Sequence, residues 1–98
     1  MNQHMSANYS ARLRQPEVLD QIRAILRRVA AESTPPVQAA YILSGPDERL
    51  RSQLRGITGM LMKDAGFRTR DVAELFGQNK YTTHTQIRRA GSRFAMPA

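Results

Sequence analysis

Hydroxyl and guanidinium groups share one side of a helix that is expected to start near Tyr81 or Thr82. At about 100° per residue, that side carries Tyr81, Thr85, Arg88 and Ser92, with Thr82 and Arg89 beside them. Hydroxyl groups can bond to base edges or phosphates, a threonine methyl can contact a thymine methyl, and arginine can bond guanine at two positions. This side of the helix therefore has the chemistry needed to read duplex DNA.

The charge of the chain is placed where such a helix would use it. The net charge is +7, from 15 Lys and Arg against 8 Asp and Glu, and Glu74 is the last acid. The cations that follow it are Lys80, Arg88, Arg89 and Arg93. A cationic surface without neighbouring acids suits a polyanion, but a solvated basic helix would have the same composition. Charge alone leaves these two interpretations open.

Residues for other kinds of chemistry are few. The chain has no cysteine, and neither His4 nor His84 has a carboxylate pair spaced around it for a metal site or a catalytic dyad. A nuclease would need clustered carboxylates, and the last third of the chain offers only Asp71 and Glu74. We therefore expect a protein that is not an enzyme and that has no cofactor, no metal ion and no small-molecule substrate.

The compartment is predicted from what the sequence lacks. No apolar run approaches the roughly 18 residues that a membrane helix needs, and the N-terminus has no signal-peptide pattern. The absence of cysteine suits a reducing compartment. We expect a soluble cytoplasmic protein without a membrane partner, associated with the nucleoid when it is bound to DNA.

The length of 98 residues corresponds to one domain. Residues 1–10 are polar and are expected to be a flexible segment, and residues 11–95 are expected to form a single helical domain. Its first helix begins at Pro16 and ends before Ser33-Thr34-Pro35-Pro36. The predicted buried stripe of this helix consists of Val18, Ile22, Ile25, Leu26 and Val29.

A helical turn over residues 37–43 is expected to precede a second long helix that starts near Ser44-Gly45-Pro46. Ser44 and Asp47 have the spacing of a capping box, and Pro46 suits the first turn. The predicted buried stripe is Leu50, Leu54, Ile57 and Leu61, and Gly66 is the expected C-terminal stop. Gly56 and Gly59 each weaken a helix by about 1 kcal/mol relative to Ala, which predicts close packing of another helix there.

A helix-turn-helix is predicted at about residues 69–94. Thr69 is the expected cap of a short helix that buries Val72, Leu75 and Phe76 and ends at Gly77. After a turn, the next helix would face the core with Thr83, Ile87, Ala90 and Phe94. The second helix of such a pair can lie in the major groove of DNA. The predicted fold is thus an all-α bundle of four to five helices with a C-terminal helix-turn-helix.

Residues 37–90 resemble the C-terminal DNA-binding domain of the bacterial replication initiator DnaA, which belongs to a Trp-repressor-like superfamily. The resemblance is carried by Arg55 to Leu61, by Val72-Ala73-Glu74-Leu75-Phe76-Gly77 and by Tyr81-Thr82-Thr83, at nearly the family's spacing. It implies that residues 79–82 contact bases and that Arg55 and Lys63 hold phosphates. The chain has no glycine-rich phosphate loop with lysine, so an initiator ATPase is not expected.

Two departures from the family pattern affect what the domain would recognise. Lys80-Tyr81 stands in place of the usual Asp-His, so the preferred DNA sequence should differ from an initiator box. The family's basic loop, which reaches the minor groove, aligns with Gly45-Pro46-Asp47-Glu48, so that contact is expected to be missing.

The sequence therefore predicts two sets of DNA contacts. The expected base contacts are Asn79, Lys80, Tyr81, Thr82, Thr85 and Arg88. The expected phosphate contacts are Arg55, Lys63, Arg68, Arg70, Arg89 and Arg93. The hypothesis is a sequence-specific binder of double-stranded DNA that regulates transcription or replication. The alternative is a protein-interaction module or decoy that keeps the initiator-like fold and binds an acidic protein, and the sequence leaves open whether the chain is a monomer or a homodimer.

Overall fold

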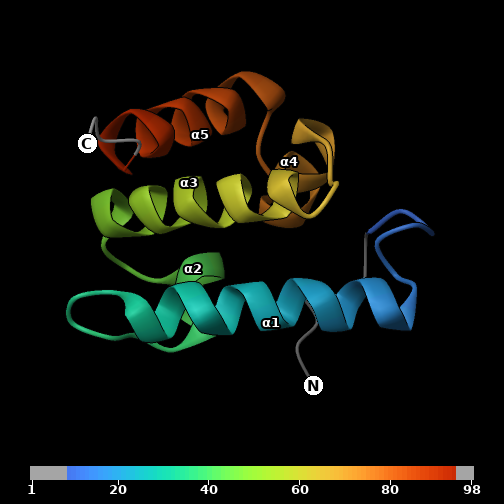
Figure 1. Cartoon of the computed structure of the whole chain (residues 1–98), viewed down its shortest axis with the longest axis horizontal. Helices are drawn as coiled ribbons and strands as arrows, with labels where there is room; N and C mark the ends of the chain where they lie inside the picture. The colour runs from blue at the N-terminus through green and yellow to red at the C-terminus, as the bar shows by residue number, and fades with distance from the viewer. Residues whose placement is uncertain (1–8, 95–98) are drawn as a thin grey trace.

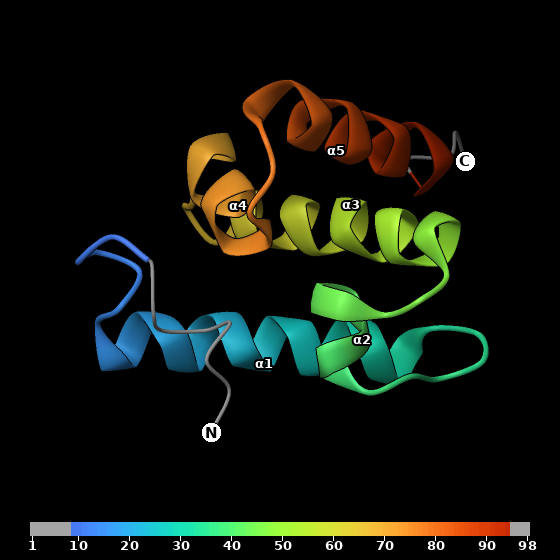
Figure 2. The ribbon, with the colours of Figure 1, turned by 180° about the vertical axis from the view of Figure 1, so that it is seen from behind.

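Five helices make up the part of the chain that the structure describes, and no strand occurs among these residues. The computed structural model describes the backbone of residues 9–94 and the side chains of residues 9–92. The helices are α1 (Pro16–Glu32), α2 (Ala39–Ser44), α3 (Glu48–Asp64), α4 (Thr69–Phe76) and α5 (Lys80–Phe94). In both views α3 lies between α1 and α5, and α4 packs at one end of α3 (Figures 1 and 2). The predicted all-α bundle is confirmed.

Helix α1 begins at Pro16 and ends before Ser33, as the sequence predicted. Pro16 is its first residue, and Ser33 is its C-cap, with an extended backbone that leads into the two prolines. The buried residues are Leu19, Ile22, Leu26, Val29 and Ala30. Val18 and Ile25, which were expected in the stripe, are only partly buried. The buried stripe is therefore rotated slightly toward Leu19 and Ala30.

The predicted start of α3 is wrong by a few residues. Ser44 is the last residue of α2, and Asp47 is the N-cap of α3, where its Oδ1 accepts a hydrogen bond from the Leu50 N–H at 3.1 Å. Pro46 therefore lies before the cap and outside the helix. The reason is that Ser44 belongs to α2, and the residue directly before α3 is Asp47.

Helix α3 is buried on more than one side because it lies between α1 and α5. Of the predicted stripe only Leu54 is fully buried, whereas Leu50, Ile57 and Leu61 are partly buried. The additional buried residues are Gly56, Thr58, Gly59 and Met62. A Cβ on Gly59 would lie 2.6 Å from Cγ1 of Ile87, which confirms the predicted close approach of another helix and identifies that helix as α5.

The segment before α1 is packed against α4. The Tyr9 hydroxyl donates to the carbonyl oxygen of Leu75 at 2.8 Å, and the Ser10 N–H donates to the Glu74 carboxylate. Leu13 has no exposed surface. The expected boundary after residue 10 is therefore placed too late, because Tyr9 and Ser10 make contacts with the domain. The rest of the expected flexible segment, residues 1–8, lies outside the described residues.

Candidate nucleic-acid interface

Helix α4 forms the first half of the predicted helix-turn-helix. It begins at Thr69, and Arg68 is the N-cap residue, whose N–H donates to Oδ2 of Asp71 at 2.8 Å. The expected cap at Thr69 is wrong by one residue. The N-cap residue is Arg68, and Asp71 accepts the hydrogen bond from its N–H. Val72, Leu75 and Phe76 are buried as predicted.

Gly77 ends α4 as predicted. Its φ of 63° and ψ of 35° lie in the left-handed region, which favours glycine because a Cβ would be strained there. The chain leaves the helix at this residue and turns into α5 through Gln78 and Asn79.

Helix α5 begins at Lys80, slightly earlier than the expected start at Tyr81 or Thr82. The start is set by Asn79, whose side-chain oxygen accepts from the Thr82 N–H at 2.7 Å. The backbone oxygen of Asn79 also accepts from the Thr83 N–H at 3.1 Å and from the Thr83 hydroxyl at 3.0 Å. The base contact expected of Asn79 remains a prediction, and its amide NH₂ group is the part left for it.

Gln78 joins the turn to α5 and to α3. Its Nε2 donates to Oγ1 of Thr83 at 2.9 Å and to Oε1 of Gln86 at 2.6 Å, and its Oε1 accepts from Nη1 of Arg55 at 3.2 Å. Nε2 of Gln86 then donates to Oγ of Ser52 at 3.1 Å. We call these five residues the turn network. Paired polar networks in partly buried places make the local structure more rigid.

Sequence reasoning did not find the turn network. Gln78 and Gln86 are polar, half-buried residues with no periodic signal, and Ser52, the partner of Gln86, is distant in sequence. The only available signal was that two glutamines lie near the turn, which fits many surface helices equally well.

Arg55 has partners within the fold. Its Nε donates to the Ile42 carbonyl at 2.8 Å and its Nη2 to the Leu43 carbonyl at 2.6 Å, so it binds oxygens near the end of α2. Its guanidinium also lies 4.8 Å from the centre of the Phe76 ring. Burial lowers the pKa of Arg55, and the neighbouring charge of Arg51 lowers it further, but an arginine stays protonated near neutral pH. The phosphate contact implied for Arg55 remains a prediction, and the structure gives this side chain a role in holding α2, α3 and the turn together.

The two sides of α5 differ as the helical spacing predicted. Thr83 and Ala90 are buried, and Ile87 packs against the core. On the other side Tyr81 is 79% exposed, and within residues 9–92 no other large hydrophobic side chain is exposed. Lys80, Arg88, Arg89 and Ser92 are also exposed, and Thr82 and Thr85 are partly exposed. Two expected residues, the phosphate contact Arg93 and the inward-facing Phe94, have side chains outside the described part.

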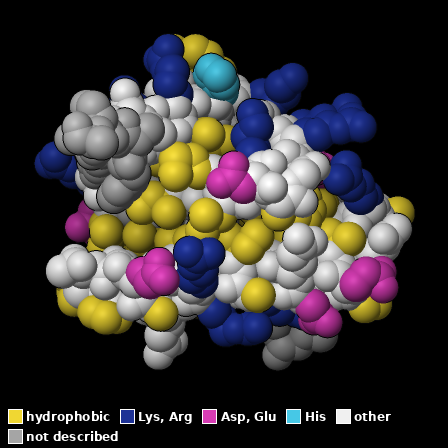
Figure 3. All heavy atoms as spheres, viewed as in Figure 1, with side chains coloured by type: hydrophobic (Ala, Val, Ile, Leu, Met, Phe, Trp, Pro, Cys, Tyr) yellow, Lys and Arg dark blue, Asp and Glu magenta, His cyan; other side chains and the backbone are white. Residues whose placement is uncertain are grey.

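The expected phosphate contacts Lys63, Arg68 and Arg70 lie on α3 and at the start of α4. Lys63 is exposed in the last turn of α3, and Arg68 and Arg70 are exposed at the start of α4. The ion pairs found in the described part of the chain join Arg12 to Asp71, Arg23 to Asp20 and Arg28 to Glu32. None of these ion pairs includes an expected phosphate contact, so none of them neutralises the charge of Lys63, Arg68 or Arg70. Lys and Arg side chains gather along the edge of the molecule formed by α5 and α4 (Figure 3).

In the range that the structure describes, no three His, Asp or Glu side chains are grouped so that they could hold a metal ion. No helix there is both long and apolar enough to cross a bilayer.

Comparisons with protein-family models, curated proteins and solved structures found no match. The geometry of α4, the turn and α5 is therefore the basis for assigning a function.

Proposed function

We propose that this chain binds double-stranded DNA sequence-specifically through α4, the turn and α5, and acts as a small regulator of transcription or replication in the cytoplasm. One observation carries the proposal. Helix α5 buries Thr83 and Ala90 against the rest of the domain and presents an opposite side that has hydroxyls, cations and an exposed Tyr81 but no acid. A helix presented in this way, after a glycine-ended helix and a short turn, fits the major groove.

The start of α5 supplies the reading groups. The N-terminal residues of a recognition helix contact base edges, and here they are Lys80, Tyr81 and Thr82. Thr85 and Arg88 continue the same side toward the middle of the helix. Free N–H groups in the first turn would also favour a nearby phosphate. The resemblance to the initiator domain supports the same assignment.

The turn network supports this use of α5 by fixing its first turns relative to α3. Gln78 bonds to Thr83 and Gln86 on α5 and to Arg55 on α3. Ordering a loop on binding costs free energy, so a turn that is already held reduces that cost. Lys63, Arg68, Arg70 and Arg89 would bind phosphates and set the orientation on the duplex.

A competition assay with single variants tests the proposal. The preferred sequence is first selected from a random DNA pool. Tyr81→Ala and Thr85→Ala should then weaken binding to that sequence by about 1 to 3 kcal/mol and leave random DNA almost unaffected. Lys63→Ala should weaken binding to the preferred sequence and to random DNA by the same factor, because a phosphate carries no sequence information. If all three variants lowered specific and random binding equally, α5 would not be reading bases.

The exposure of Tyr81 also favours a second candidate, the protein-interaction module or decoy. Aromatic and arginine side chains are enriched at protein interfaces, and Tyr81 lies on the same side of α5 as Arg88. In this case the acid-free side of α5 would bind an acidic protein surface. If Tyr81→Ala and Lys63→Ala left DNA binding intact but disrupted a protein complex, this second function would replace the first.

A further inference from the structure

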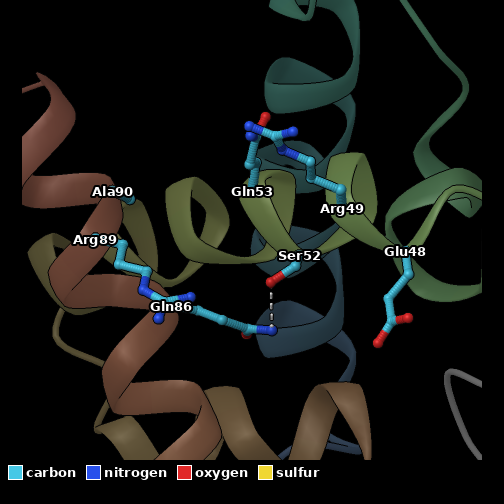
Figure 4. A pocket seen from close by; sticks show the side chains of 7 residues that line it. All are labelled: Glu48, Arg49, Ser52, Gln53, Gln86, Arg89 and Ala90. Atoms are coloured by element: carbon cyan, nitrogen blue, oxygen red, sulfur yellow. Dashed lines mark hydrogen bonds between the residues drawn. The ribbon is translucent and has the colours of Figure 1, made fainter.

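A cleft with a volume of about 540 Å³ lies between the first half of α3 and the second half of α5 (Figure 4). Arg49, Ser52 and Gln53 line it from α3, and Gln86 and Arg89 line it from α5. The two helices touch just beyond it, where Gly56 of α3 meets the backbone of α5. The cleft is thus the place where the helices separate after their closest approach.

The lining of the cleft is rich in hydrogen-bond donors. Oγ of Ser52 accepts from Nε2 of Gln86 at 3.1 Å, drawn as the dashed line in Figure 4, and no described bond uses the Ser52 hydroxyl proton. Arg49 and Arg89 are exposed and take part in none of the ion pairs within the described residues. Glu48 is the one acid among the lining residues, so the lining has two arginines and one carboxylate.

This set of groups matches a phosphate in charge and in hydrogen bonding. A phosphate has several acceptor oxygens. A guanidinium group can bind it with two parallel N–H hydrogen bonds. A hydroxyl that already accepts one bond keeps its proton for such an oxygen.

We infer that the cleft between α3 and α5 binds a phosphate group, held by Arg49 and Arg89 with the Ser52 hydroxyl as a further donor. The phosphate can come from the DNA backbone or from a small phosphorylated molecule. The first source rests on the proposed function, and the second does not. Gln86 belongs to both the cleft and the turn network, so an occupant would contact a side chain that also holds the turn.

The test compares Arg49→Gln with Arg27→Gln in the full chain. Arg27 is an exposed arginine of α1 that does not line the cleft, so both variants lose the same charge. In the first arm, inorganic pyrophosphate is titrated without DNA while amide signals are followed by NMR. Saturable shifts at Ser52, Gln86 and Arg89 are expected, with about tenfold weaker binding in Arg49→Gln but not in Arg27→Gln.

In the second arm, DNA affinity is measured over a range of salt concentrations. If the phosphate belongs to DNA, Arg49→Gln should reduce the slope of log affinity against log salt by about 0.9, and Arg27→Gln should not. Pyrophosphate binding with an unchanged slope would identify a small phosphorylated molecule as the source. Thermal melts show that each variant is folded, and Ser52→Ala gives a second variant that removes only the hydroxyl.

The outcomes separate this inference from the proposed function. If Tyr81→Ala showed no loss of sequence preference but pyrophosphate still bound through Arg49, the proposed function would fail and the phosphate site would stand. If Arg49→Gln and Arg27→Gln behaved alike in both arms, the phosphate site would be overturned whatever the domain does with DNA.

Discussion

The backbone carbonyl of Gln86 lies directly against Gly56, so that α5 and α3 meet at this point with no side chain between them. A Cβ on residue 56 would overlap the Gln86 oxygen and would lie 3.2 Å from Cβ of Ala90. The position of the proposed recognition helix is therefore set by a backbone contact, which cannot adjust by a change of rotamer.

Gly56→Ala should destabilise the domain by about 1 to 3 kcal/mol, because the new methyl group forces two helices apart. The loss should appear even though alanine is the better helix former by about 1 kcal/mol. Urea unfolding followed by circular dichroism measures it. Gly91→Ala is the matched control, since its nearest atom would be Sδ of Met60 at 3.8 Å, an ordinary contact. The control should be neutral or more stable than wild type, and equal effects at both glycines would contradict the packing.

Asp47→Ala should cost about 1 kcal/mol, since it removes the acceptor for the Leu50 N–H at the start of α3. Ser44→Ala should change stability much less, because the Ser44 hydroxyl makes only a long bond of 3.4 Å to the Ala40 carbonyl. Thermal melts of the two variants compare them directly. A larger loss of stability in Ser44→Ala than in Asp47→Ala would indicate that Ser44 caps α3, as the sequence predicted.

Gln78→Ala should lower stability by about 1 to 2 kcal/mol, because Arg55, Thr83 and Gln86 each lose a partner. Gln53→Ala serves as the control, since the Gln53 side chain is also half-buried and makes no hydrogen bond among the described residues. Hydrogen exchange of the first amides of α5 should accelerate only in Gln78→Ala. Equal protection in the two variants would show that the turn is held by other contacts.

Stability should decrease at alkaline pH in a way that depends on Tyr9. Burial raises the pKa of the Tyr9 hydroxyl above 10.0, and the nearby Glu74 carboxylate raises it further. The folded state thus keeps this proton more strongly than the unfolded chain, so the contribution of the neutral group is complete below pH 10.0 and is lost as pH rises through the folded pKa. Urea titrations between about pH 8 and pH 11 should show a steeper loss in wild type than in Tyr9→Phe. Parallel curves would mean that Tyr9 is not buried against Leu75.

DNA binding should weaken strongly with salt. If about five phosphates are neutralised by the cations around α5, log affinity should fall with log salt at a slope of about −4 to −5. Fluorescence anisotropy of labelled DNA at several salt concentrations measures this slope. A slope near zero would remove the electrostatic part of the proposal.

The helix order was predictable because Pro16 marks the start of α1, Gly77 marks the end of α4, and apolar residues repeat at helical spacing. Pro16 and Gly77 lie where the sequence placed them, and Val72, Leu75 and Phe76 are buried as expected. The burial pattern of α3 was only partly predictable. A single stripe describes a helix with one packed side, whereas α3 has neighbours on two sides, which buries Met62 and Gly56 as well.

Side-chain partners could not be predicted from spacing. Helix caps are often Ser, Thr or Asp, the types found at Ser44, Asp47, Thr69 and Asp71. Only the course of the backbone decides which of these side chains bonds at a helix end. The bonds of Arg55 to Ile42 and Leu43 depend on how α2 lies beside α3, a relation that no local pattern in the sequence encodes. The same holds for the candidate site, where the outward side of α5 was predicted but the turn network was not.

The bond between Tyr9 and Leu75 has a consequence for the order of events during synthesis. The two residues are 66 positions apart, so the first described residues of the chain find their partner only after α4 has been made. Until then Tyr9 and Ser10 have no α4 to contact. Closing so long a loop also carries an entropic cost. We expect the nascent chain to complete its fold late, after α4 has left the ribosome.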